Sequence, residues 1–220
     1  MSSFVLKIIA VISMLIDHSG YLIFNGFSFM NYIGRLAFPI FAFLITEGYI
    51  HTSNLKKYFC RLLLFAVISQ IPYMLFIGTI TNDFSLNILF TLALGLLAIT
   101  VYNKFKNKSL GILFVALCSV LAHFLHFDYG WFGVTIIFIF YIFKNEKKYM
   151  NILFVITTFI NYFYYFAKTL RTEHLLIFLF CSLSLIPINF YNGKKGKNIK
   201  YFLYIFYPLH LIVLYLIKLI

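Results

Sequence analysis

Long apolar runs alternate with short polar breaks along the whole chain, and this pattern predicts membrane-spanning helices. About twenty apolar residues, at a rise of roughly 1.5 Å each, cross the hydrocarbon core of a bilayer. The predicted spans are 4–24, 32–50, 58–78, 86–103, 110–126, 130–143, 149–167, 174–191 and 199–219. The run 130–143 is shorter than a full crossing, so we expect it to be tilted or lengthened by snorkelling of its flanking charges. The sequence therefore predicts an all-α fold, a polytopic transmembrane helical bundle of about nine spans.

Charge alternates from one polar break to the next. The breaks after the second, fourth, sixth and eighth runs are basic and contain Lys56, Lys57, Arg61, Lys104, Lys106, Lys108, Lys144, Lys147, Lys148, Lys194, Lys195, Lys197 and Lys200. The intervening breaks are uncharged around Phe27, contain Asp83 or Asp128, or are nearly balanced at Lys168, Arg171 and Glu173. The positive-inside rule then predicts cytoplasmic basic breaks, an N-terminus inside and Lys218 outside.

Composition supports a membrane protein and excludes several other classes. Of the 220 residues, 63% are hydrophobic and 11% are charged, which is more apolar surface than a soluble domain can hide. The net charge of +12 falls in the basic breaks, so membrane orientation explains it and no nucleic-acid partner is expected. The three cysteines, Cys60, Cys118 and Cys181, lie in different apolar runs and predict neither a disulfide nor a zinc site.

No repeat or long linker interrupts this pattern, so 1–220 is predicted to form a single domain. The first run lacks a strongly basic start and a small-residue cleavage site, and we expect it to be a retained helix rather than a signal peptide. The lipid bilayer is thus an expected partner, and the chain is expected to cross the membrane several times.

The first run contains an unusual pair of ionisable neighbours, Asp17 and His18. A charged side chain near the bilayer centre costs about 2.5 to 3.5 kcal/mol on insertion scales, so intramembrane ionisable groups mark functional sites with partners on other helices. Neighbouring helical residues point about 100° apart, so we expect His18 to face a different helix from Asp17. His18 could be a hydrogen-bonded packing residue, but beside an intramembrane carboxylate we favour catalysis or substrate contact.

Arg35 in the second run is the expected partner of Asp17. Counted from the turn near Phe27, Asp17 lies ten residues back and Arg35 eight residues forward, so their depths differ by about 3 Å. An ion pair between them would offset the insertion cost of both charges. The pair could lock the two helices together, or it could orient the site in which His18 works.

Other polar groups lie further along the chain. Glu47 is expected at the cytoplasmic mouth, either as a surface residue or as the wall of a vestibule. Asn87 and Thr91 share a helical face, which packing through polar residues explains. His210 follows Pro208 near the membrane midplane, where it could line one cavity with His18.

A cluster of His123, His126 and Asp128 lies where the fifth run ends. Two histidines three residues apart beside a carboxylate could bind a metal, but no third firm ligand is evident. We therefore interpret all three as interfacial polar residues and expect no metal.

Several blocks resemble the TraX family of integral membrane acetyltransferases. They are Leu6-Lys7-Ile8-Ile9-Ala10 through Ile16-Asp17-His18, Gly34-Arg35-Leu36-Ala37-Phe38-Pro39-Ile40-Phe41-Ala42-Phe43 with Glu47-Gly48, Asn87-Ile88-Leu89-Phe90-Thr91-Leu92, Asp128-Tyr129-Gly130 with Gly133, and Phe206-Tyr207-Pro208-Leu209-His210. They follow one another in order over nearly the whole chain. The family also looks like a distant relative of membrane acyltransferases that modify sugars and that place a histidine in an early helix and a Tyr-x-x-His-like element in a late one.

The resemblance implies acetyl transfer from acetyl-CoA, as donor substrate, to an amine or hydroxyl of a peptide, such as a pilin N-terminus, or of a cell-envelope glycan. It also implies a location in a bacterial cytoplasmic membrane, which the chain would cross several times. His18, Asp17 and Arg35 become the candidate catalytic residues. The candidate substrate-binding residues are Glu47, Asn87, Tyr207 and His210, with His210 assisting the leaving thiolate or the donor. Two alternatives remain: a proton-coupled transporter with an Asp/Arg/His relay, and a non-catalytic assembly subunit in which the charges only pin helices.

Overall fold

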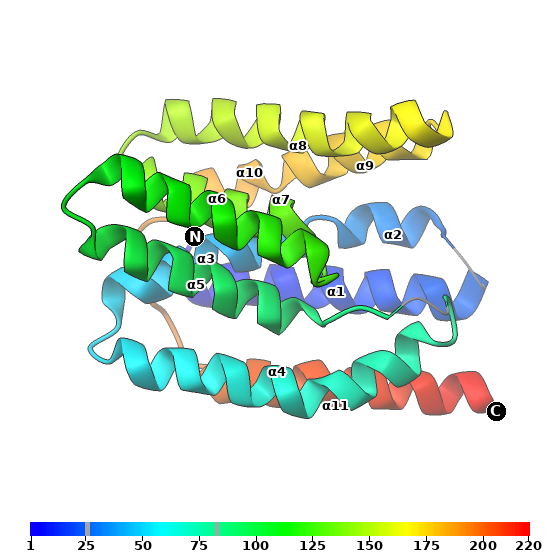
Figure 1. The fold of residues 1–220 in the computed structure, drawn as a ribbon. Coiled ribbons are helices and arrows are strands. Elements are labelled where there is room, and N and C mark those ends of the chain that lie inside the picture. The colour runs from blue at the N-terminus through cyan, green and yellow to red at the C-terminus, as the bar shows by residue number, and fades with distance from the viewer. Residues whose placement is uncertain (25–26, 82–83) are drawn as a thin grey trace.

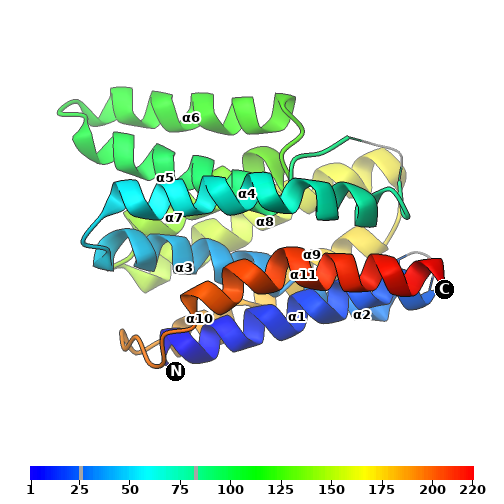
Figure 2. The same cartoon turned by 90° about the horizontal axis from the view of Figure 1, so that it is seen from below.

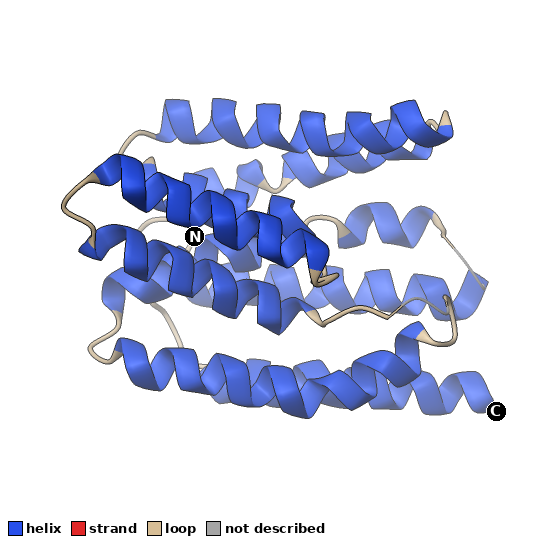
Figure 3. Ribbon diagram, viewed as in Figure 1, coloured by secondary structure: helices blue, strands red, loops and turns tan. Residues whose placement is uncertain are grey.

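The fold is a bundle of helices, as the pattern of apolar runs predicts. The structure, a computed structural model, describes residues 1–24, 27–81 and 84–220. Within these ranges it contains α1 (Ser3–Phe24), α2 (Phe29–Gly34), α3 (Ala37–His51), α4 (Leu55–Ile77), α5 (Ile88–Lys104), α6 (Lys108–Phe124), α7 (Gly130–Ile142), α8 (Lys147–Thr169), α9 (Glu173–Leu183), α10 (Leu185–Asn189) and α11 (Lys200–Leu219) (Figure 1). Figure 3 shows helices joined by loops, with no strand in the described part of the chain. The predicted all-α fold class is confirmed.

Five helical segments among the described residues are long and apolar enough to cross a membrane. They are Ser3–Phe24, Phe29–His51, Leu55–Ile77, Lys147–Thr169 and Lys200–Leu219. The remaining apolar helices have fewer than 18 residues, so the expected number of nine crossings stays a prediction. Many large apolar side chains on the outer faces are exposed, such as Ile71 (72%) and Phe124 (72%), which suits contact with lipid rather than water.

The four basic connections lie at the same end of the bundle as the N-terminus (Figures 1 and 2). We call this the basic end. The C-terminus lies at the opposite end, as the alternation of charges predicts. Asp83, from one of the predicted outward breaks, lies outside the described residues.

Two of the predicted spans are broken into shorter helices, each by a proline. Pro39 is the third residue of α3, and its ring excludes the helical position of the carbonyl four residues earlier, which belongs to Arg35. The chain therefore turns at Arg35 and Leu36, whose backbone N–H groups donate to Tyr32 and Ile33 at 3.2 Å. Pro187 stands at the same position in α10, and α9 ends four residues before it. The first break leaves Arg35 at a helix junction.

Three consecutive helices, α5, α6 and α7, are too short to reach both ends of the bundle. They contain 17, 17 and 13 residues, or about 20 to 26 Å of helix, compared with a hydrocarbon core of about 30 Å. The turn between α6 and α7 therefore ends part-way along the molecule (Figure 1). This geometry brings a loop residue, Asp128, to the level of α1 side chains.

Candidate functional site

The predicted ion pair between Asp17 and Arg35 is present. Arg35 Nη2 lies 3.4 Å from Asp17 Oδ1, and the two side chains are only 17% and 13% exposed. Arg35 Nη2 also donates a hydrogen bond to Tyr21 Oη at 3.0 Å, and the guanidinium lies 5.8 Å from the centroid of the Phe27 ring. The charge of Arg35 is therefore held by one carboxylate, one phenol and one aromatic face.

Asn31 of α2, a residue that the sequence did not single out, fixes the position of Asp17. Asn31 Nδ2 donates to the Asp17 carbonyl oxygen at 2.7 Å and to Asp17 Oδ1 at 3.2 Å, while Asn31 Oδ1 accepts from the backbone N–H of Ser28 at 2.7 Å. Gly34 lies directly against the Asp17 side chain, so an added Cβ there would overlap the carboxylate. The position of Asp17 thus depends on a buried amide and a glycine.

His18 and His210 form a direct pair across α1 and α11. Nδ1 of His18 lies 2.7 Å from Nε2 of His210, and the two rings stack at 5.0 Å with an interplanar angle of 4°. Nδ1 of His210 lies 2.9 Å from the carbonyl oxygen of Phe206. The sequence placed the two histidines at similar depth, and the structure joins them.

The hydrogen-bond partners assign the tautomers of this pair. A carbonyl oxygen only accepts, so Nδ1 of His210 carries the proton and, in the neutral ring, its Nε2 is an acceptor. Nδ1 of His18 must then donate to that Nε2, which leaves the lone pair of His18 on its own Nε2. The arrangement gives His18 a fixed basic nitrogen.

Asp17, His18 and Arg35 line a common cavity of about 250 Å³, which we call the histidine cavity. Tyr207 from α11 and Asp128 from the α6–α7 turn also belong to its polar wall. A basic imidazole, a guanidinium and two carboxylates therefore converge on one space. Such a space suits proton transfer coupled to the binding of a polar group.

Asp128 was interpreted from the sequence as an interfacial residue, and the structure places it in the histidine cavity instead. Its backbone N–H donates to the carbonyl of Leu86 at 2.8 Å, and its carbonyl accepts from the hydroxyl of Thr91. These bonds tie the turn to the start of α5 and direct the carboxyl inward. Burial raises the pKa of Asp128 to about 7, although the charge of Arg35 opposes this shift. Only the resemblance to a family block, Asp128-Tyr129-Gly130, pointed to this position.

Two candidate substrate-binding residues lie outside the cavity walls. Asn87 is completely buried, where its Nδ2 donates to Ala66 and Gln70 at 2.8 Å and its Oδ1 caps α5 through Leu89. Both ring nitrogens of His210 are engaged, so it supports His18 where contact with the donor was expected. Asn87 thus fastens α5 to α4, and His210 contacts His18 and the backbone of its own helix.

The histidines at the end of α6 do not gather with other metal ligands. His123 and His126 are exposed, and the described residues contain no group of three or more His, Cys, Asp or Glu side chains that could hold a metal. Their interpretation as surface polar residues agrees with this position.

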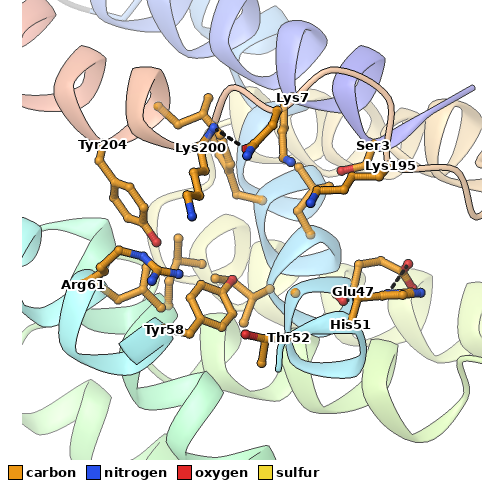
Figure 4. Close-up of a pocket in the computed structure, with 18 of the residues that line it drawn as sticks. Ser3, Lys7, Glu47, His51, Thr52, Tyr58, Arg61, Lys195, Lys200 and Tyr204 are labelled. Atoms are coloured by element: carbon orange, nitrogen blue, oxygen red, sulfur yellow. Dashed lines mark hydrogen bonds and ion pairs between the residues drawn. The ribbon is translucent and has the colours of Figure 1, made fainter. Parts of the chain in front are cut away.

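A second, larger cavity of about 440 Å³ opens at the basic end, and we call it the basic cavity (Figure 4). Glu47 lies on its wall as the vestibule hypothesis expected, with Oε2 3.6 Å from Nδ1 of His51. Arg61 lies there too, whereas Lys56 and Lys57 are exposed outside it. The two cavities share the following wall residues: Met14, Phe41, Ile88 and Tyr207.

A comparison with protein-family models shows which family this chain belongs to. A family model described as "TraX protein" matches residues 2–218. The chain belongs to the TraX family. Membership, together with five apolar helical segments of membrane-spanning length among the described residues, agrees with a membrane protein.

Two curated proteins of bacteria are similar to this TraX family member. The probable fimbrial assembly protein FimC, serogroup H1, of Dichelobacter nodosus is 32% identical over 238 residues, which cover 97% of this chain and 94% of that protein. The uncharacterized protein RP591 of Rickettsia prowazekii (strain Madrid E) is 31% identical over 150 residues, which cover 64% of this chain and 56% of that protein. No solved structure matches this TraX protein.

Proposed function

We propose that this protein is an integral membrane acetyltransferase that moves acetyl from acetyl-CoA to an amine or hydroxyl. The hydrogen-bonded pair of His18 and His210 carries the proposal, because it gives His18 a basic nitrogen on the wall of a cavity that also contains Arg35. General bases of this kind accelerate transfer by about 10² to 10⁴-fold. Family membership supports the same chemistry.

In the proposed step, the acceptor nitrogen or oxygen attacks the carbonyl carbon of the thioester. As the new bond forms, Nε2 of His18 takes the acceptor proton, and the positive ring that results is stabilised by its Nδ1–H bond to His210. Arg35 offsets the negative charge that develops on the carbonyl oxygen. When the carbon–sulfur bond breaks, the thiolate leaves and takes the proton from His18, which restores the neutral pair.

The remaining side chains position this machinery. Asp17 holds Arg35, and Asn31 holds Asp17. Tyr207 stands between the two cavities, where the acetyl group of a donor in the basic cavity would meet the acceptor. Low access of bulk water would protect the thioester from hydrolysis.

The acceptor class is proposed from the relative. FimC of Dichelobacter nodosus is named a probable fimbrial assembly protein, which favours a peptide acceptor, such as the N-terminus of a pilin subunit, over a cell-envelope glycan.

The test uses membranes that contain the full chain, labelled acetyl-CoA and fimbrial or envelope material from the same cells. His18→Ala should lower acetyl transfer by about 10² to 10⁴-fold while expression stays normal. His123→Ala, at an exposed histidine outside both cavities, is the matched control and should keep its activity. Full activity in His18→Ala would refute the proposed role, and uptake of a solute without acetyl-CoA would favour a transporter.

A further inference from the structure

The basic cavity concentrates positive charge on its walls. Among the described residues that line it are four cationic side chains, Lys7 from α1, Arg61 from α4, Lys195 from the α10–α11 loop and Lys200 from α11. Figure 4 shows them around one space. Four separate segments of the chain thus bring their cations to the same place.

Little negative charge balances them. Glu47 is the one carboxylate among the described lining residues, and it already faces His51 at 3.6 Å. Lys7 and Lys195 lie close enough to repel each other. Like charges that share a partly enclosed space destabilise one another, and a bound anion would remove that cost.

The surroundings of Arg61 suit the binding of such an anion. Its guanidinium carbon lies 5.8 Å from the centroid of the Tyr58 ring, and Tyr204 lines the same cavity beside it (Figure 4). Nε of Arg61 is nevertheless buried without a hydrogen-bond partner in the described part of the chain. A guanidinium held against an aromatic ring and with an unused Nε donor suits the recognition of phosphate.

Membrane orientation alone does not require this convergence. Lys104, Lys106 and Lys148 also belong to the basic end, and their side chains are exposed outside the cavity. Lys7, Arg61 and Lys200 are instead partly buried on the cavity wall. The volume of about 440 Å³ lies within the range of sites for cofactor-sized ligands, about 300 to 1,000 Å³.

We propose that the basic cavity binds the phosphate groups of a soluble organic polyphosphate, the nucleotide part of the acyl donor, through Lys7, Arg61, Lys195 and Lys200. This inference rests on the proposed function, which requires a thioester donor but does not itself assign a place to it. The walls that the two cavities share would then bring the acyl end of the donor to Ile88 and Tyr207, beside the histidine cavity. The lipid phosphate of an anionic bilayer offers the same chemistry, and the test separates the two sources.

The test measures equilibrium binding of CoA and of 3′,5′-ADP to the full chain in phosphatidylcholine nanodiscs. Neither probe contains an acetyl group, so the result does not depend on catalysis. Arg61→Gln and Lys195→Gln should each weaken binding of both probes by about tenfold or more, as expected for the loss of a charge-assisted phosphate contact. Lys195 is exposed in a loop, so its variant tests the site even where Arg61→Gln fails to fold.

The control is Lys106→Gln, which removes the same charge from an exposed lysine at the same end of the molecule. If Lys106→Gln and Lys195→Gln lowered the affinity for the probes equally, the general positive potential of the basic end would explain binding, and the proposed site would be refuted. Absence of probe binding in phosphatidylcholine nanodiscs would also overturn the proposed site. Displacement of both probes by added phosphatidylglycerol, with no dependence on Lys195, would overturn it in favour of a lipid phosphate.

The same measurements separate this inference from the proposed function. His18→Ala should bind CoA as the parent does while losing transfer, which would support a donor site distinct from the base. If CoA binding depended on Arg61 and Lys195 but no acetyl transfer were found, the proposed enzyme activity would be refuted and the phosphate site supported. If acetyl transfer were found but the affinity for CoA did not depend on either residue, the phosphate site would be refuted and the enzyme activity supported.

Discussion

Replacing His210 by leucine tests how the imidazole pair works. The substitution removes the acceptor of the His18 Nδ1–H bond and leaves a buried side chain of similar size. Without that acceptor the ring of His18 is free to take the other tautomer and to rotate. The positive ring formed during transfer also loses its stabilising partner.

The magnitude follows from the bond that is lost. A hydrogen bond to a charged group contributes about 1.5 to 3 kcal/mol, and every 1.36 kcal/mol in a barrier changes a rate about tenfold. His210→Leu should therefore lower kcat by about 10 to 100-fold. Because His210 lines neither cavity, the KM for acetyl-CoA should stay close to that of the parent.

The assay is the transfer of labelled acetyl from acetyl-CoA in membranes, with the concentration of acetyl-CoA varied to separate kcat from KM. Leu209→Ala, one residue away on the exposed face of α11, controls for damage to the helix. An unchanged kcat would refute the proposed role of His210 in holding and stabilising the ring of His18. A raised KM with normal kcat would refute it too, and would return His210 to the donor-binding role expected from the sequence.

Three further predictions concern the residues around the pair. Gly34→Ala should lower the thermal stability of the protein and its activity, because the added Cβ overlaps the Asp17 carboxylate. Overpacking of this kind costs about 1 to 3 kcal/mol, and an unchanged Tm would contradict the close contact between Gly34 and Asp17. Exchange of Asp17 and Arg35 for one another should not restore transfer lost in the single variants, because Asn31 Nδ2 would then face a cation; recovery would favour charges that only pin helices. Burial raises the pKa of Asp128 from 3.8 to about 7, so the folded protein binds a proton that the unfolded chain releases, and stability from this group falls as pH rises between those values. The fall in Tm from about pH 5 to about pH 8 should accordingly be smaller in Asp128→Asn than in the parent, and equal falls would show that Asp128 is solvated.

Local sequence features predicted most of the helices because a helix depends on its own apolar run. The predicted span 86–103 compares with α5 at Ile88–Lys104, and 149–167 with α8 at Lys147–Thr169. The break at Arg35 was missed although its cause, Pro39, stands four residues later in the sequence. A proline in the first turn of the second segment is a signal that the apolar pattern alone does not show.

The site was harder to predict because it depends on contacts between distant segments. Similar depth was enough to pair Asp17 with Arg35, since only a few residues of sequence separate the two runs. The same reasoning left the rotation of α11 open, so the contact of His18 with His210 could not be predicted. Asp128 was missed because its inward direction arises from backbone pairing with Leu86, which no side-chain pattern records.

The chain of imidazoles ends on a peptide oxygen, that of Phe206, in the place where a soluble hydrolase commonly has an acid. In the tautomers assigned above the histidine pair is therefore electroneutral, and burying it in hydrocarbon avoids the penalty of about 2.5 to 3.5 kcal/mol that an additional carboxylate would impose. In the mechanism we propose, charge would separate only while an acceptor is being deprotonated. The backbone of the proline-containing helix α11 thus provides the orienting dipole without adding a charge to the membrane.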